Sequence, residues 1–132
     1  MRLLLDTHIL LWVLEEHPSL STQARDLIQD TANEVFVSSA SLFEIAIKTR
    51  IGKLHTQRTT SDVVRELDQT LAIQLLPILA THLDAYQVLP LYEDHRDPFD
   101  RLLLATAQVE QLTLISDDEK FERYASLVAL IR

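Results

Sequence analysis

Leu3-Leu4-Leu5-Asp6 begins the chain with three apolar residues that end at a carboxylate. A short run that is apolar without alternation is typical of a strand buried on both faces of a parallel sheet. Four more short apolar runs are at 35–37, 73–78, 113–115 and 128–131. Helical patterns lie between the runs, at 21–32, 42–51, 61–71 and 100–111, with shorter ones at 79–89 and 119–126. Strands that alternate with helices predict an α/β fold with right-handed crossovers.

The composition predicts one globular domain over residues 1–132. The chain is 47% hydrophobic and 24% charged, and a chain of this size buries roughly two thirds of its unfolded surface. It has no cysteine, which excludes disulfides and thiolate zinc sites. Its single glycine, Gly52, excludes glycine-rich phosphate loops. The sequence has no apolar run of about 18 residues and no signal peptide, so we expect a cytoplasmic protein that does not contact membranes.

The formal net charge is −8. A net acidic chain is a poor general binder of nucleic acid, because affinity for phosphates depends on cations. A nucleic-acid role would therefore need a local basic patch or bound metal ions. One segment, 45–61, has basic residues and no acid. It is either an edge that contacts phosphates or an ordinary solvated helix end.

Acidic side chains follow the predicted strands. Asp6 comes directly after the first strand, and Glu44 comes one helical turn after the second. Asp100 begins the helix at 100–111, and Asp117 and Asp118 follow the strand at 113–115. Parallel strands present their carboxyl ends at one edge of the sheet, where α/β proteins bind ligands. We therefore expect these carboxylates to converge in one crevice.

Each acid alone also has a capping explanation. Asp6 can cap the helix that begins near Thr7. Capping spacings also occur in Ser41–Glu44, Ser116–Glu119 and Asp97-Pro98-Phe99-Asp100. Capping does not explain why Glu44 lies in an apolar stretch, where an acid must point outward, be paired or bind a metal. Oxygen ligands without His or Cys favour Mg²⁺ or Mn²⁺, ions that bind phosphate oxygens and activate water.

Four segments, in order along the chain, resemble the acidic motifs of PIN-domain ribonucleases of the VapC toxin family. They are Leu4–Trp12, Ser38–Lys48, His95–Ala105 and Leu114–Phe121. The resemblance implies a three-layer α/β/α sandwich on a mostly parallel sheet. It implies an endoribonuclease that depends on Mg²⁺ or Mn²⁺ and acts as the toxin of a type II toxin–antitoxin pair. It also implies an RNA substrate, a homodimer and a cognate VapB-like antitoxin.

The resemblance also assigns roles by position. The catalytic, metal-binding acids are Asp6, Glu44, Asp100 and Asp118, with Asp117 as the alternate for the last, and Asp97 is assigned to capping. Thr7 and Ser116 are expected to be hydroxyls that support these acids. The candidate RNA contacts are Lys48, Arg50, Lys53, Arg96 and Arg101.

Other functions fit the sequence less well. Haloacid-dehalogenase-like phosphatases place a second acid two residues after the first, and here that residue is His8. Receiver domains have an acid pair near the N-terminus, which this chain lacks. An alternative from a different class is a catalytically silent module whose acidic crevice captures a basic partner peptide.

Overall fold

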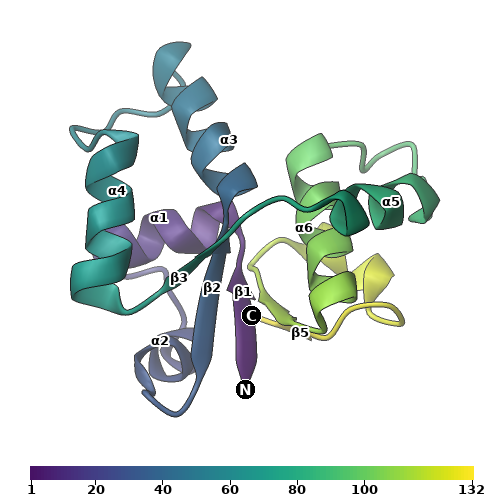
Figure 1. Cartoon of the computed structure of the whole chain (residues 1–132), viewed down its shortest axis with the longest axis horizontal. Coiled ribbons are helices and arrows are strands. Elements are labelled where there is room, and N and C mark those ends of the chain that lie inside the picture. The colour runs from purple at the N-terminus through teal and green to yellow at the C-terminus, as the bar shows by residue number, and fades with distance from the viewer.

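The computed structural model describes residues 1–132 and has a five-stranded, all-parallel sheet in the order β3-β2-β1-β4-β5 (Figure 1). The strands are β1 (Arg2–Leu5), β2 (Glu34–Ser38), β3 (Gln74–Leu76), β4 (Thr113–Ile115) and β5 (Leu130–Ile131). In the central strand, Leu5 lies opposite Val37 of β2 and Ile115 of β4. The predicted α/β fold on a parallel sheet is confirmed.

Helices cover both faces of the sheet and make three layers (Figure 1). On one side are α1 (Thr7–Glu15), α2 (Thr22–Gln29), α3 (Ser39–Arg50) and α4 (Thr60–Glu66). On the other are α5 (Ala80–Val88), α6 (Pro98–Glu110) and the 3-10 helix η2 (Glu119–Tyr124). Leu3 and Leu5 pack into the first apolar cluster, and Leu4 packs into the second. This alternation explains why residues 3–5 of the first strand are all apolar.

Several elements are shorter than the sequence predicts. The runs at 73–78 and 128–131 contribute only three and two strand residues, in the edge strands β3 and β5. The helix predicted over 61–71 is α4 followed by one π-helical segment, η1 (Leu67–Leu71). That segment ends at Ala72, whose φ of 53° is left-handed and stops the helix before β3.

Helix caps decide where the acidic side chains lie. Asp6 accepts a hydrogen bond from Ile9 N at 2.7 Å and caps α1. Asp97 caps α6, so both of these capping predictions are confirmed. The capping box predicted at Ser41 and Glu44 is wrong, because Ser38 caps α3 and Glu44 lies in the interior of that helix. The box predicted at Ser116 and Glu119 is also wrong, because Asp118 caps η2.

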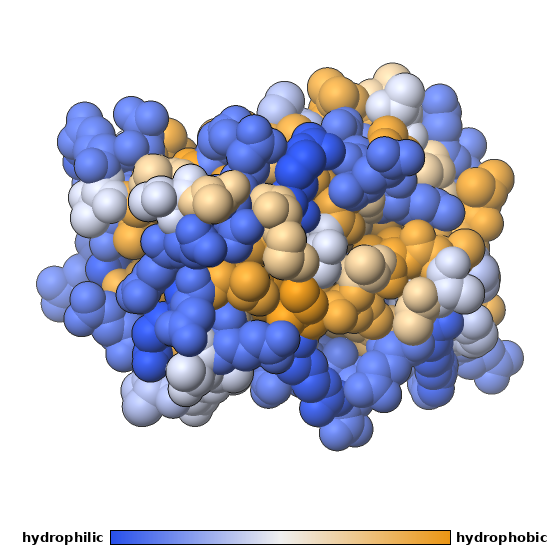
Figure 2. Space-filling view, turned by 90° about the horizontal axis from the view of Figure 1, so that it is seen from below, coloured by the Kyte–Doolittle hydropathy of each residue, from blue (hydrophilic) through white to orange (hydrophobic).

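The helices and the surface give two further observations. None of the helices combines the length and the apolar character that crossing a membrane requires. In Figure 2, which views the end of the sheet where the strands begin, apolar residues form a band from the middle toward the side of α5 and α6. Exposed apolar side chains of α5, α6 and the segment between them are Leu83, Val88, Leu91 and Val109.

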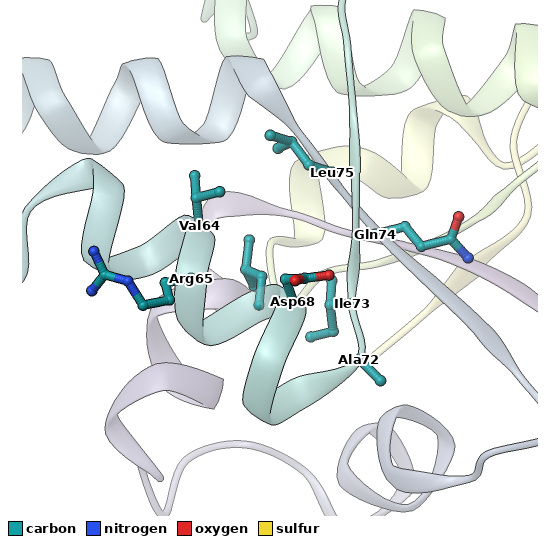
Figure 3. Close-up of a pocket in the computed structure, with 8 residues that line it drawn as sticks. Val64, Arg65, Asp68, Ala72, Ile73, Gln74 and Leu75 are labelled. Atoms are coloured by element: carbon teal, nitrogen blue, oxygen red, sulfur yellow. The ribbon is translucent and has the colours of Figure 1, made fainter.

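A hollow of about 650 Å³ lies between α4, η1 and the edge strand β3 (Figure 3). Five of its eight lining residues are hydrophobic, and its charged side chains are Arg65 and Asp68. Its lining holds one acid and one base and no cluster of acids such as a metal site needs.

Candidate active site

The carboxyl edge of the sheet carries a cleft of about 480 Å³. Asp6 lies there because β1 ends at Leu5, and its own N–H donates to Ile115 O of the neighbouring strand at 3.1 Å. Three other elements bring acids to the same cleft: α3, the start of α6 and the loop after β4. The residues that line it are Asp6, Thr7, His8, Leu11, Glu44, Lys48, Lys53, Leu54, Asp97, Asp100, Asp117 and Asp118. The predicted convergence of the acids is therefore seen in the structure.

Asp6 is the most enclosed aspartate of the cleft, with 5% of its surface exposed. Burial raises the pKa of its carboxyl, since a charge is poorly solvated there. Hydrogen bonds from the Ser116 side chain and Ile9 N oppose this shift, and the charge of Asp118 adds to it. The buried Thr7 hydroxyl donates to Ser41 Oγ at 3.0 Å and so ties α1 to α3 beside the cleft.

Glu44 projects into the cleft from α3 and is 6% exposed. Lys48, one turn later on the same helix, places Nζ at 2.9 Å from Glu44 Oε2. This hydrogen bond raises the pKa of Lys48, so the ammonium stays charged. Glu44 therefore lies in an apolar stretch as one member of an ion pair, and the pairing lowers the cost of burying its charge.

Asp100 lies in the first turn of α6, and the pKa of its carboxyl is also raised. Burial, followed by the negative charges of Asp97, Glu44, Asp6 and Asp118, raises its pKa to about 7. A carboxyl in this state gains from any cation that enters, because the cation removes the repulsion that favours the proton. Asp97 contributes to this repulsion while its own oxygen accepts from Phe99 N and Asp100 N.

Asp117 and Asp118 are both exposed and both line the cleft. The charge of Asp118 reaches Asp6 and Asp100, and raises the pKa of each. Asp117 is not among the causes of either shift. Asp118 Oδ1 accepts from Lys120 N at 2.9 Å, and its own N–H donates to Ser116 Oγ at 3.1 Å. Asp118 is thus held beside Ser116, at a place from which its charge acts on both Asp6 and Asp100.

Comparison with known proteins gives the family. The family model for the PIN domain matches residues 3–127. The chain belongs to the PIN domain family. A search among curated proteins finds no match.

Solved structures share the PIN fold across almost the whole chain. VapBC2 from Rickettsia felis, bound to a DNA fragment from its promoter, is 19% identical, covers 99% of this chain and 98% of that chain, and has a TM-score of 0.71. FitAcB from Neisseria gonorrhoeae is 20% identical, with coverages of 98% and 96% and a TM-score of 0.65. VapBC-1 from nontypeable Haemophilus influenzae is 15% identical, with coverages of 99% and 97% and a TM-score of 0.64. At these identities, the likeness concerns the fold.

The donor set of this PIN domain fits a hard divalent cation. Its acidic side chains offer only oxygen, the ligand type that Mg²⁺ and Mn²⁺ prefer. Burial, and after it the neighbouring acids, raise the pKa values of Asp6 and Asp100, so a cation that enters the cleft would favour their ionised forms. As they are placed, no three His, Cys, Asp or Glu side chains are close enough to hold one ion together.

The basic residues expected to contact RNA lie in different surroundings. Lys48 and Lys53 line the cleft, while Arg50 and Arg96 are exposed outside its lining. The prediction for Arg101 is wrong: it is 4% exposed and donates to Pro90 O at 2.8 Å and Leu89 O at 3.3 Å. Its guanidinium closes the loop before α6 and does not reach the cleft surface.

His95 is the site residue that sequence reasoning missed. It is 2% exposed and contacts Asp100 Oδ2 through Nε2 at 3.2 Å. Burial lowers the pKa of His95, so its imidazole is neutral at pH 7. Its position in the segment His95-Arg96-Asp97-Pro98-Phe99-Asp100, just before a helix cap, is the one signal in the sequence.

Proposed function

We propose that residues 1–132 form one PIN nuclease domain that cleaves RNA in a metal-dependent reaction, as the toxin of a type II toxin–antitoxin pair. The observation that carries the proposal is the cleft itself. Two enclosed acids, Asp6 and Glu44, share it with Asp100 and Asp118. A structural role as helix caps accounts for Asp6 and Asp118, but gives no reason to bury Glu44 inside α3.

Asp6, Glu44, Asp100 and Asp118 are the residues that would hold Mg²⁺ or Mn²⁺. When bound, such an ion lowers the pKa of a water molecule and polarises a phosphate group. Burial of Asp6 and Glu44 keeps two carboxylates in place on rigid elements, the end of β1 and the interior of α3. Lys48 Nζ, held by Glu44, and the exposed Lys53 supply positive charge to the phosphates of an RNA strand at the rim.

The partners proposed here are inferred from proteins that share the fold. Several of these are described as toxin–antitoxin complexes, among them one from Klebsiella pneumoniae with a TM-score of 0.59. By this likeness, the partner proposed here is a VapB-like antitoxin. The apolar band on the side of α5 and α6 supports a homodimer, because large apolar patches on soluble proteins mark contact surfaces. Light scattering of the wild type and of Val88→Asp tests the dimer.

Cleavage of total cellular RNA by the purified protein tests the reaction. Fragments should form with Mg²⁺ or Mn²⁺, and should be absent with EDTA. Asp6→Asn should abolish cleavage while keeping the α1 cap, because asparagine caps helices as well as aspartate. Asp26→Asn is the matched control, since Asp26 is exposed on α2 and does not line the cleft. Cleavage that persists with EDTA or in Asp6→Asn would contradict the proposal.

One observation favours the alternative of a silent binding module. The carboxylates are not placed so that three of them can hold one ion. A silent module would bind a basic peptide in the same cleft, so a binding assay does not separate the two functions. Turnover does: a folded wild-type protein that binds a basic peptide and cuts no RNA with either metal would be such a module.

A further inference from the structure

His95 is enclosed between the start of α6 and the 3-10 helix η2. Its imidazole has two polar partners: Nε2 lies 3.2 Å from Asp100 Oδ2, and Nδ1 lies 3.0 Å from Tyr124 Oη. The ring of Phe121 packs edge-on against it, with the ring centroids 5.7 Å apart. Both ring nitrogens therefore have a polar partner, and the ring is buried.

One assignment of the protons directs every donor of this cluster toward Asp100. Arg101 only donates, and its Nη1 lies 3.5 Å from Tyr124 Oη, which therefore accepts. In this assignment the single Tyr124 proton goes to His95 Nδ1, the proton of the neutral ring is on Nε2, and Nε2–H donates to Asp100 Oδ2. The chain Arg101–Tyr124–His95–Asp100 thus has every donor directed toward the carboxylate.

We infer that His95 is a positioning residue that holds Asp100 in the orientation needed to bind a divalent metal. The inference rests on the proposed function, in which Asp100 is one of the metal-binding acids. The Nε2–H bond occupies Oδ2 and leaves Oδ1 without a hydrogen-bond partner in the protein. Groups that hydrogen-bond to metal ligands fix their orientation, and losing such a group costs about 10–100-fold in metal affinity.

The same helix carries a control for this arrangement. His82 is also fully buried, and its Nε2 lies 2.8 Å from Glu110 Oε1, at the other end of α6. Its Nδ1 accepts from Leu79 N at 3.1 Å, so this ring also donates from Nε2. Both histidines are thus buried rings bonded to an acid of α6, but only the acid that partners His95 lines the cleft. A purely structural role predicts the same outcome for both.

The experiment measures the Kd for Mn²⁺ by electron paramagnetic resonance, together with the melting temperature. His95→Leu should raise the Kd about 10–100-fold. His82→Leu should lower the melting temperature as well, but leave the Kd at the wild-type value. His95→Gln, which keeps an N–H donor on a longer side chain, should restore part of the affinity. Tyr124→Phe removes the proton that fixes the tautomer and should give a smaller rise, while Tyr86→Phe, on a ring that packs over Arg101, should give none.

A wild-type Kd in folded His95→Leu would overturn the inference, and so would an equal loss of affinity in both leucine variants. Should His95→Leu fail to fold, the tyrosine pair decides: an unchanged Kd in Tyr124→Phe overturns the inference, and a rise absent from Tyr86→Phe supports it. Failure of the wild type itself to bind Mn²⁺ is a separate result, which overturns the metal site of the proposed function.

Discussion

Asp100 makes the stability of the metal-free protein depend on pH. Its pKa is raised to about 7 by burial and by the neighbouring acids, so the folded state holds a proton that the unfolded state has released. Stability therefore falls as pH rises from about 4 to about 7. Asp100→Asn removes this titration and keeps an oxygen for His95. We expect the variant to match the wild type near pH 4.5 and to be more stable at pH 8, by roughly 1–4 kcal/mol.

Urea unfolding at several pH values measures this difference. Mg²⁺ adds a second readout, because a ligand that binds only the folded state raises its stability. The ion should raise the melting temperature of the wild type more at pH 8 than at pH 5, where protons compete for Asp100. Equal stabilisation at both pH values, or a wild-type pH profile retained in Asp100→Asn, would contradict this explanation.

Arg101 is expected to matter for folding and not for RNA. Arg101→Met keeps much of the side-chain volume but leaves the carbonyls of Pro90 and Leu89 without their donor. An unsatisfied buried acceptor costs about 1–3 kcal/mol, which urea unfolding would detect. Arg96→Met is the matched change at an exposed arginine and should cost little. Equal stability of Arg96→Met and Arg101→Met would show that the buried guanidinium is not needed.

At the scale of the element, α6 depends on its first turn. Asp97 accepts hydrogen bonds from Phe99 N at 2.9 Å and Asp100 N at 3.0 Å, with Pro98 at the first helical position. Asp97→Ala should cost about 1 kcal/mol of stability, because it removes the cap. Asp97→Ser should keep most of that stability, because serine also caps while the charge is lost.

The two variants Asp97→Ala and Asp97→Ser also separate the two effects of Asp97, which are its cap on α6 and its charge near Asp100. Asp97 is the first of the charges that raise the pKa of Asp100, after burial. Both variants should therefore lower that pKa, which the pH dependence of unfolding would show, while only Asp97→Ala loses the cap. A loss of stability in Asp97→Ser as large as that in Asp97→Ala would mean that the hydroxyl does not replace the carboxylate.

The elements show how far the sequence predicts this PIN domain. The strand over residues 3–5 was predictable because both faces of β1 are covered there, so all three of these side chains are buried and apolar. The start of α3 was not, because Ser38 and Ser41 both suit a cap and only the end of β2 decides between them. The π-helical turn after α4 has no signal in the apolar pattern.

The site was predictable to a similar extent. The convergence of the acids was predictable because Asp6 and Asp118 follow strands, Glu44 comes one helical turn after a strand, and Asp100 begins a helix at the same edge. The partnership of His95 with Tyr124 joins residues 29 positions apart and depends on how η2 folds back. The burial of Arg101 likewise depends on a loop whose path the sequence does not indicate.

The whole molecule carries a net charge of −8, and six of its 20 acidic residues line the cleft that the RNA of the proposed function would have to approach. Its two apolar clusters hold the sheet from both sides and fix the cleft at one edge. In the proposed function, a bound cation and the two lysines of the cleft, Lys48 and Lys53, would attract the phosphates of RNA. This distribution predicts weak RNA binding without a divalent ion, and few direct contacts between protein cations and phosphates.

Lys53 provides the test of those contacts. It is exposed, lines the cleft and forms no ion pair, whereas Lys48 forms an ion pair with Glu44. The measurement uses the inactive Asp6→Asn protein, so that the RNA is bound but not cut. Adding Lys53→Gln should weaken RNA binding whatever the RNA sequence. It should also lower the slope of log K against log salt by about one. Arg65→Gln, far from the cleft on α4 and paired with Asp62, is the control and should leave the slope unchanged.

Fluorescence anisotropy with a labelled single-stranded RNA, titrated over a range of KCl at fixed Mg²⁺, measures both slopes. A slope that falls equally in both variants would reflect only the net charge of the molecule. A slope that falls only in Lys53→Gln would mean that one phosphate of the RNA lies at the rim of the acidic cleft. The phosphodiester would then lie within reach of the carboxylates, because Lys53 and the four acids line the same 480 Å³ cleft.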